Sequence, residues 1–387
     1  MKQFLSFLLC CTLTLSSPVL AAENSEADLS VSAPSVLLME ASTGTVVYEK
    51  NAHEIRHPAS ITKIMTLILI FDAIERGQIS LTDTVTVSEY AASMGGSQVF
   101  LEPGETQTVE TMIKCISVAS ANDACVAMAE YLCGSESEFV RQMNERARGL
   151  GMKDTTFVNC CGLDTEGHMT SAYDVALMSR ELTVNHPEIH NYCTIWMENI
   201  THVTKQGTKE FGLSNTNKLI RFYSGATGLK TGFTEKAMYC LSATAEREGV
   251  EYIAVIMHAD TIDKRNNDAK VLLSYGFANY RLMPLRSPDV LPPVRVTLGS
   301  ADSVQPVYDG AEAALVPKNG IGEVSYEIEL PDTITAPVEK GQQIGTLRVV
   351  SGETELYTVK LLADSSVARA SFGRTLLELV KSYVGLG

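Results

Sequence analysis

The chain reads Pro58-Ala59-Ser60-Ile61-Thr62-Lys63 at the start of an apolar run that continues to Arg76. The run is apolar almost all round, so it predicts a buried helix over 61–76. Residues i and i+3 share a helix face, which brings the Lys63 amine within reach of the Ser60 hydroxyl. A serine is a weak nucleophile until a base takes its proton, and a lysine can be that base when burial lowers its pKa. Ser60 and Lys63 are therefore candidates for a nucleophile and its base.

A simpler interpretation of this stretch is a helix N-cap serine followed by a solvated lysine. The apolar neighbours Ile61, Ile64 and Met65 weigh against it, because they would surround the lysine. The start of a helix also presents backbone N–H groups near Ser60, where they can stabilise a developing oxyanion.

Two short polar motifs lie far downstream of this helix. Ser120-Ala121-Asn122 precedes a helical pattern, and its hydroxyl and amide can face a cleft, although both residue types are also common caps. Lys230-Thr231-Gly232, followed by Phe233, places a lysine and a hydroxyl beside a glycine, which suits a carboxylate ligand; a plain strand after a turn is the alternative. The spacing of a phosphate loop is absent.

The pattern around these motifs mixes helices and strands. Apolar stretches predict two early strands joined by a hairpin turn at 41–44, where Gly44 tolerates φ > 0. The expected strands are 35–40, 45–49, 239–245 and 252–257, and the expected helices are 122–132, 136–150 and 264–280. Strands at both ends with helices between them predict an α+β domain over 23–282, whose sheet joins early and late segments.

The C-terminal third changes character. Four prolines between 284 and 293 indicate a linker, and alternating runs at 324–330 and 356–361 predict a small all-β domain over 284–363. The tail over 365–387 carries one apolar stripe, which predicts an amphipathic helix. This helix could lie in a membrane surface, giving peripheral membrane contact, or pack on its own protein.

The N-terminus has the pattern of a secretory signal peptide. Lys2 is followed by an apolar run over 4–15 and by the small-residue end Val19-Leu20-Ala21-Ala22, so we predict that residues 1–22 are removed after Ala21 or Ala22. The apolar run is shorter than the ~20 residues of a membrane span. We therefore expect an exported protein, located at the outer face of the cytoplasmic membrane or in the cell wall space.

Composition limits the remaining possibilities. The 387 residues are 45% hydrophobic and 20% charged, with a net charge of −15. These values exclude wholesale disorder, and an acidic chain without Lys and Arg runs has no footprint for nucleic acid. Two of the nine cysteines fall in the signal peptide, and the odd seven cannot all pair internally. We expect them to be small buried apolar residues.

The three motifs together resemble the active-site serine penicillin-recognising enzymes. More closely, the chain resembles the low-molecular-mass penicillin-binding proteins, the serine D-alanyl-D-alanine carboxypeptidases. The resemblance extends to other short stretches, to the β domain and to the tail, and it covers nearly the whole mature chain. The stretches are Gly95-Gly96-Ser97, Leu101 to Glu105, Phe157-Val158-Asn159, Gly162-Leu163, His168, Ala172-Tyr173-Asp174 and Asn215-Thr216-Asn217.

This resemblance implies a penicillin-binding/β-lactamase-like catalytic fold and an assigned set of site residues. Ser60 would attack the carbonyl between the last two D-alanines of a peptidoglycan stem peptide, and Lys63 would be its base. No cofactor or metal is implied, and β-lactams would act as inhibitors. Ser120 would relay protons to the leaving D-alanine, and Asn122 would bind the substrate amide. Lys230 and Thr231, in the motif that ends at Gly232, would bind the terminal carboxylate. The backbone N–H groups of Ser60 and Phe233 would form the oxyanion hole.

Two other functions remain open from the residues alone. A β-lactamase of the same fold would turn penicillin over rapidly, and a non-catalytic wall-binding protein would bind peptide without a covalent adduct. The middle motif is Ser-Ala-Asn and not the Ser-Asp-Asn of class A β-lactamases, and no deacylating glutamate is evident, which favours the peptidase.

One group of possible metal ligands lies outside the three motifs. His186, His190 and Cys193 have a spacing that could hold zinc on a helix. Pro187 and the missing glutamate of H-E-x-x-H argue against zinc, and we expect a structural role.

Overall fold

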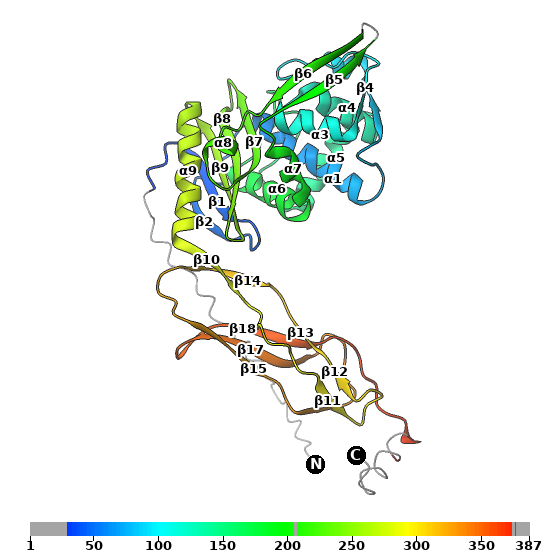
Figure 1. Ribbon diagram of the computed structural model, residues 1–387, viewed down its shortest axis with the longest axis vertical. Helices are drawn as coiled ribbons and strands as arrows, with labels where there is room; N and C mark the ends of the chain where they lie inside the picture. Colours follow the sequence, from blue (N-terminus) through cyan, green and yellow to red (C-terminus); the bar gives the residue numbers. More distant parts are fainter. Residues whose placement is uncertain (1–28, 205–206, 374–375, 377–387) are drawn as a thin grey trace, which may run out of the picture.

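The computed structural model describes residues 29–204, 207–373 and 376. The described chain forms two parts, an upper one of helices and strands and a lower one of strands alone (Figure 1). This confirms the predicted combination of an α+β domain and a small all-β domain. The predicted signal peptide and most of the predicted tail helix lie outside the described residues.

The upper part is built on one five-stranded sheet. All neighbouring strands are antiparallel, and their order is β2-β1-β9-β8-β7. The sheet therefore joins early and late segments of the chain, as predicted, and among the described residues β7 has a strand neighbour on one side only. The strands are β1 (Ser35–Glu40), β2 (Val46–Lys50), β7 (Ala226–Thr234), β8 (Met238–Arg247) and β9 (Val250–Ala259).

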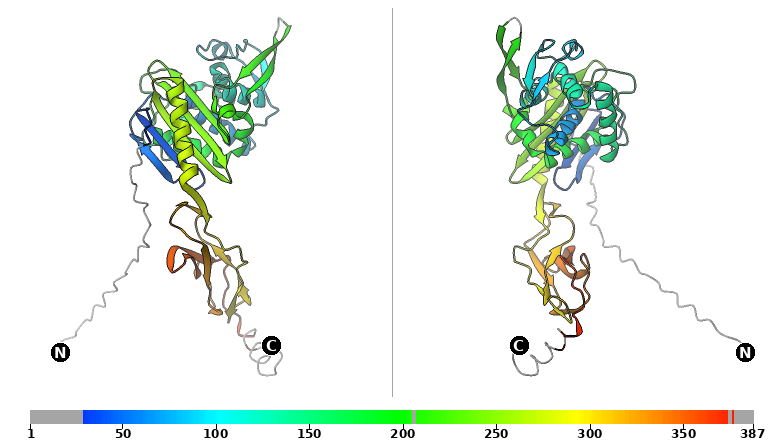
Figure 2. Two further views of the ribbon diagram at one scale, coloured as in Figure 1. Left: turned by 60° about the vertical axis from the view of Figure 1, so that its left-hand side comes forward. Right: turned by 90° about the vertical axis from the view of Figure 1, so that its right-hand side faces the viewer.

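Both faces of this sheet are covered, which explains why its central strands are apolar on both sides. Helix α9 (Ile262–Asn279) lies across one face, where it packs on alternate residues such as Val36 and Leu38 (Figure 2). The intervening residues Leu37 and Met39 face the larger core. That core contains the helices α1 (Lys63–Glu75), α3 (Val109–Val118), α4 (Asn122–Cys133), α5 (Glu136–Gly149), α6 (Ala172–Asn185) and α7 (His190–Cys193).

Helix α1 is the buried helix predicted from the apolar run. Every residue from Lys63 to Ala73 is buried, so the helix is surrounded by other elements. The first turn differs from the prediction, because Ala59–Thr62 forms a 3-10 turn, η1, and the α-helix begins only at Lys63.

A hairpin of β5 (Met197–Thr204) and β6 (Gly207–Ser214) projects from the helical side (Figure 1). The sequence pattern does not predict this hairpin, since β6 carries mostly exposed polar residues and lacks a clear apolar alternation. A shorter pair, β3 (Thr84–Thr86) and β4 (Thr106–Thr108), and three short turns complete this part. The turns are α2 (Glu89–Ala92), η2 (Pro187–Ile189) and α8 (Leu219–Phe222).

The lower part continues directly from α9. Strand β10 (Tyr280–Pro284) pairs with β14 (Ala313–Pro317), and this ribbon joins the two parts. Below it, two small sheets enclose two apolar clusters, one around Leu347 and one around Val296. The strands of these sheets are β11 (Val294–Thr297), β12 (Ser303–Val304), β13 (Pro306–Tyr308), β15 (Val324–Glu329), β16 (Thr333–Thr335), β17 (Gln343–Ser351) and β18 (Thr354–Ala363).

Three further observations concern the described residues. All seven cysteines outside the predicted signal peptide are free thiols, and all but the half-buried Cys133 are buried, as expected. No helix in the described ranges is long and apolar enough to cross a membrane. At the start of the tail, Phe372 and Leu376 are exposed.

Candidate active site

The candidate nucleophile lies in the turn that precedes α1. Ser60 is half-buried, and its hydroxyl accepts a hydrogen bond from Lys63 Nζ at 3.0 Å. Ala59 has a φ of 48°, an uncommon conformation for a residue with a side chain, and it begins the tight turn that carries Ser60. The contact expected from the i, i+3 spacing is therefore present, although it spans the junction of a 3-10 turn and an α-helix.

The Lys63 amine is fully buried and has three hydrogen-bond acceptors. Besides Ser60 Oγ, it donates to Asn122 Oδ1 at 2.7 Å and to the Cys161 carbonyl oxygen at 2.6 Å. Asn122 begins α4, and its Nδ2 donates to the Gly95 carbonyl oxygen at 2.7 Å, which fixes the direction of its amide. An ammonium group has three donors, so these acceptors fix the whole amine.

The second motif contacts the third directly. Lys230 Nζ, on β7, donates to Ser120 Oγ at 2.9 Å and to the Thr231 carbonyl oxygen at 3.1 Å. Ser120 also has a positive φ, 61°, two residues before α4 begins. Burial, assisted by the nearby charge of Lys63, lowers the pKa of Lys230 to about 7. A lysine with this pKa can change its charge near neutral pH.

Two glycines allow the backbone segments around Ser60 to approach closely. A Cβ on Gly232 would lie 3.0 Å from the Pro58 carbonyl oxygen, so β7 packs directly against the nucleophile turn. On the other side, a Cβ on Gly162 would lie 1.9 Å from the Ala59 carbonyl oxygen, and Gly162 has a φ of 91°. The contact at Gly162 requires glycine, whereas a Cβ at Gly232 would be tight and would push its neighbours by a few tenths of an ångström.

The outer rim of the site is more exposed. Phe233 is 51% exposed and packs on Tyr239 with ring centroids 4.5 Å apart. Next to it, Thr234 donates from its hydroxyl to Asp164 Oδ1 at 2.8 Å, which ties the end of β7 to the loop that follows Gly162. On the inner side, the Thr231 hydroxyl lies 2.6 Å from the Thr216 hydroxyl.

Sequence reasoning missed two groups near the site. The Cys161 carbonyl belongs to the backbone, which leaves no signature in a single sequence. Arg265, on α9, is 4% exposed and donates to Asn266 Oδ1 at 3.1 and 2.9 Å. Burial lowers the pKa of Arg265 to about 10, and its charge contributes to the low pKa of Lys230. One arginine in a helical pattern gives no signal that separates it from a solvated residue.

The residues considered for zinc do not share a site. His186 Nε2 lies 3.1 Å from Asp72 Oδ1, whereas His190 contacts the Thr227 carbonyl oxygen and Glu251. In the described part of the chain, the group with suitable metal-ligand atoms is Asp72, Glu181 and His186. Arg146 pairs with both of those carboxylates, so a guanidinium already supplies the positive charge there.

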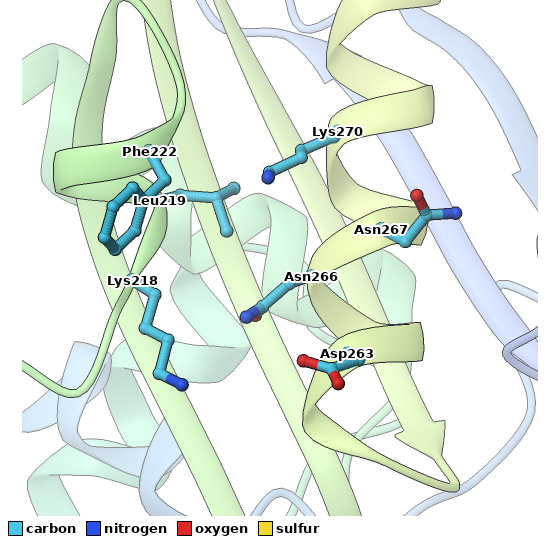
Figure 3. A pocket seen from close by; sticks show the side chains of 7 residues that line it. All are labelled: Lys218, Leu219, Phe222, Asp263, Asn266, Asn267 and Lys270. Atoms are coloured by element: carbon cyan, nitrogen blue, oxygen red, sulfur yellow. The ribbon is translucent and has the colours of Figure 1, made fainter.

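A separate cavity of about 360 Å³ lies between α8 and α9. Its lining includes Lys218 and Phe222 on one side and Asp263, Asn266 and Lys270 on the other (Figure 3). Helix α9 packs on one face of the sheet, and α1 and α6 pack on the other. None of the predicted site residues lines this cavity.

Comparison with known proteins agrees with this architecture. A family model described as D-alanyl-D-alanine carboxypeptidase matches residues 21–261, which is more than half of the chain. The chain belongs to this D-alanyl-D-alanine carboxypeptidase family. A second model, the C-terminal domain of penicillin-binding protein 5, matches residues 286–369.

Two relatives match most of this chain, and a third matches 64% of it. The D-alanyl-D-alanine carboxypeptidase DacF of Bacillus subtilis is 40% identical over 96% of each chain. Penicillin-binding protein 5 of Haemophilus influenzae has a similar structure, with a TM-score of 0.74 and 28% identity over 88% of this chain and 98% of that one. Penicillin-binding protein D2 of Listeria monocytogenes, solved in an ampicillin-bound form, is 32% identical over 64% of this chain and 98% of that one, with a TM-score of 0.53.

Proposed function

We propose that the chain is an exported serine D,D-carboxypeptidase that removes the terminal D-alanine from peptidoglycan stem peptides through an acyl-enzyme on Ser60. One observation carries this proposal, namely the buried Lys63 amine held 3.0 Å from the Ser60 hydroxyl by two further acceptors. Family membership supports the substrate class, and the ampicillin-bound relative supports inhibition by β-lactams.

Lys63 would act as the general base in its neutral form. A neutral amine has two N–H donors and one lone pair. If the donors bond to Asn122 Oδ1 and to the Cys161 carbonyl, the lone pair is directed at the remaining neighbour, the Ser60 hydroxyl. The Ser60 proton would then pass to Lys63 as Ser60 Oγ attacks the peptide carbonyl. The backbone N–H groups of Ser60 and Phe233 would stabilise the oxyanion.

Lys230 and Thr231 would bind the carboxylate of the terminal D-alanine. Both are buried, and a charge-assisted hydrogen bond is stronger in such an environment than in water. Ser120 would carry a proton to the leaving amine, since its hydroxyl is already bonded to Lys230. Asn122 would contribute to binding of the substrate amide. A water molecule would then hydrolyse the ester on Ser60, which releases the shortened peptide.

The division of the chain supports this activity outside the cytoplasm. We propose that residues 1–22 direct export and that residues 23–282 perform the catalysis. Residues 284–363 would form a spacer, and the tail would contact the membrane surface through its apolar stripe. The exposed Phe372 and Leu376 at the start of the tail support that contact.

Intact mass measured over time, after the mature protein is mixed with penicillin, tests the catalytic proposal. We expect a long-lived adduct that is absent in Ser60→Ala and present in Ser224→Ala, which changes an exposed serine outside the site. An adduct that disappears while penicillin is consumed would indicate a β-lactamase. No adduct in the wild type would leave a non-catalytic wall-binding protein.

Truncation after Ala370 tests the membrane proposal. The cut retains the hydrogen bonds of Val367 with Val338 and of Ala370 with Leu298, which attach the end of the chain to the β domain. We expect the truncated protein to leave the membrane fraction and to keep full acylation by penicillin. Continued retention in the membrane fraction would contradict this role of the tail.

A further inference from the structure

The loop between α5 and α6 is docked on the nucleophile turn. Its two ends are tied by backbone pairs, Thr156 with Met169 and Thr170 with Arg56. In the middle of the loop, the Cys161 carbonyl accepts from Lys63 Nζ at 2.6 Å. The position of this carbonyl therefore depends on how the loop is held against the turn.

One buried histidine connects the loop with the turn. His168 Nδ1 accepts from the backbone N–H of Val158 at 2.9 Å and lies 3.4 Å from the backbone nitrogen of Asn159. Because backbone N–H groups donate to Nδ1, the ring proton is on Nε2. Nε2 lies 2.8 Å from the Thr62 hydroxyl oxygen and donates to it. Thr62 directly precedes Lys63, so His168 joins the segment that carries Lys63 to the loop that carries Cys161.

The link from this histidine to Cys161 passes through Asn159. The Asn159 side-chain oxygen accepts from the backbone N–H of Cys161 at 3.2 Å and of Gly162 at 2.7 Å. His168 holds the backbone at the base of this small turn, and Asn159 holds its tip. A change at His168 would therefore move the Cys161 carbonyl relative to Lys63.

We propose that His168 is a positioning residue for the acylation step, which directs the Lys63 amine at Ser60 by fixing the Cys161 carbonyl. The proposal rests on the proposed role of Lys63 as the base. Without this acceptor the amine can rotate, and its lone pair is no longer confined to the direction of Ser60 Oγ. Small displacements of a catalytic group lower rates strongly, by about 10²-fold for 1 Å.

His168 keeps the same hydrogen bonds across the pH range in which the enzyme would work. It is 1% exposed, and burial together with the neighbouring charges of His57 and Lys63 lowers its pKa to about 4. The ring is therefore neutral near pH 7, with one donor and one acceptor. Glutamine also offers one donor and one acceptor, whereas alanine offers neither.

The test compares acylation rates by penicillin in the mature full-length protein. We expect His168→Ala to lower the acylation rate by about 10–100-fold, in keeping with a displaced catalytic group. For release of D-alanine from a D-Ala-D-Ala peptide, kcat should fall while KM changes little, since no group proposed to bind substrate is altered. His168→Gln should recover most of the lost rate.

Two further variants separate positioning from general destabilisation. Thr62→Val removes the same hydrogen bond from the other side, so the double variant should be no slower than the slower single one. His186→Ala removes a comparably buried histidine near Asp72, away from Ser60, and should lower the melting temperature without lowering acylation of the folded protein.

Three outcomes would overturn the proposal while leaving the proposed function intact. The first is His168→Ala acylating Ser60 at the wild-type rate. The second is a loss of acylation rate that follows the loss of stability equally in both variants, His186→Ala and His168→Ala. The third is rate losses for Thr62→Val and His168→Ala that multiply in the double variant. Failure of the wild type to form an adduct would instead remove the proposed function.

Discussion

The two domains differ in whether they bury polar and charged side chains. Among the described residues, every buried polar or charged side chain lies between Ser35 and Asp268, and the β domain contributes none. The ion pairs of the β domain, such as those of Arg348, are exposed. The catalytic domain, in contrast, buries Lys63 and Lys230 almost completely.

This difference separates what stability requires from what chemistry requires. Burying a charged group costs free energy unless it is paired and hydrogen-bonded, and an apolar core avoids that cost. Neither lysine has a carboxylate partner among its described hydrogen bonds; the acceptors are hydroxyl, amide and carbonyl oxygens. Such an arrangement is reasonable where an amine must give up or accept a proton.

Replacing Lys63 tests whether the buried lysines of the catalytic domain serve the chemistry, and we expect it to have the largest effect. Lys63→Met should lower the acylation rate by about 10³-fold, because the proposed general base is lost. The rate is measured by intact mass after mixing with penicillin. The matched control is Lys236→Met, an exposed lysine beyond β7, which should acylate normally. A Lys63→Met rate within tenfold of the wild type would contradict the proposed base.

Replacing Leu347 tests whether the apolar core of the β domain serves its stability alone. This side chain is fully buried in the β domain, so Leu347→Ala should lower the free energy of unfolding of that domain by about 2–5 kcal/mol. Calorimetry measures the loss, and Val307→Ala, at a 41% exposed position, serves as the control. Acylation of Ser60 should not change. A parallel loss of acylation would show that the two domains are not independent.

Replacing Lys230 tests how much stability a buried lysine of the catalytic domain costs, because that cost depends on pH. Below pH 7 the lysine is protonated in the folded and unfolded chains, so the full cost of the buried charge is present. Between pH 7 and about 10.4 only the unfolded chain keeps the proton, and wild-type stability rises with pH.

Lys230→Met has no group that titrates at this position, so this contribution to the pH dependence is absent. The difference in unfolding free energy, variant minus wild type, should therefore be more favourable to the variant at pH 6 than at pH 9. The expected difference is roughly 2–3 kcal/mol if the pKa in the folded state is about 7. Denaturant unfolding at the two pH values measures it, and the hydrogen bonds lost to Ser120 and Thr231 contribute equally at both. An equal effect at both pH values would show that Lys230 has an ordinary pKa.

Replacing Arg348 should have the smallest effect. Its guanidinium bridges Glu327, Glu329 and Glu355 on the exposed surface of the β domain, and solvent and salt screen such pairs. Arg348→Gln should therefore change the melting temperature little at low salt and not measurably at high salt. A large loss at high salt would mean that this domain depends on charge pairs as well as on its apolar clusters.

Much of the fold was predictable because it follows from apolar periodicity. The buried helix after Ser60, the early hairpin and the two late strands all have continuous apolar signals, and their bounds agree within a few residues. The β5–β6 hairpin was missed since its strands are largely exposed. The start of α1 was misplaced because the positive φ of Ala59, the first residue of the 3-10 turn, has no sequence signature.

The candidate site was only partly predictable from the residues themselves. The Ser60–Lys63 contact follows from local spacing. Contacts of Lys63 with Asn122 and of Ser120 with Lys230 depend on the packing of distant elements. The resemblance to a family placed these residues in one site but did not predict the contacts between them. The backbone acceptor at Cys161 could not be inferred, since a carbonyl is present at every position.

The edge position of β7 has a consequence for selectivity. A strand paired on one side can hydrogen-bond an extended chain on its other side, and backbone hydrogen bonds carry no information about side-chain identity. In the proposed function, discrimination among peptides would then depend on the ends of the ligand, where a terminal carboxylate would meet Lys230 and a scissile bond would meet Ser60. A site of this kind tolerates variation in the middle of its ligands and is strict about how they end, which would also make it open to small molecules that share only that ending.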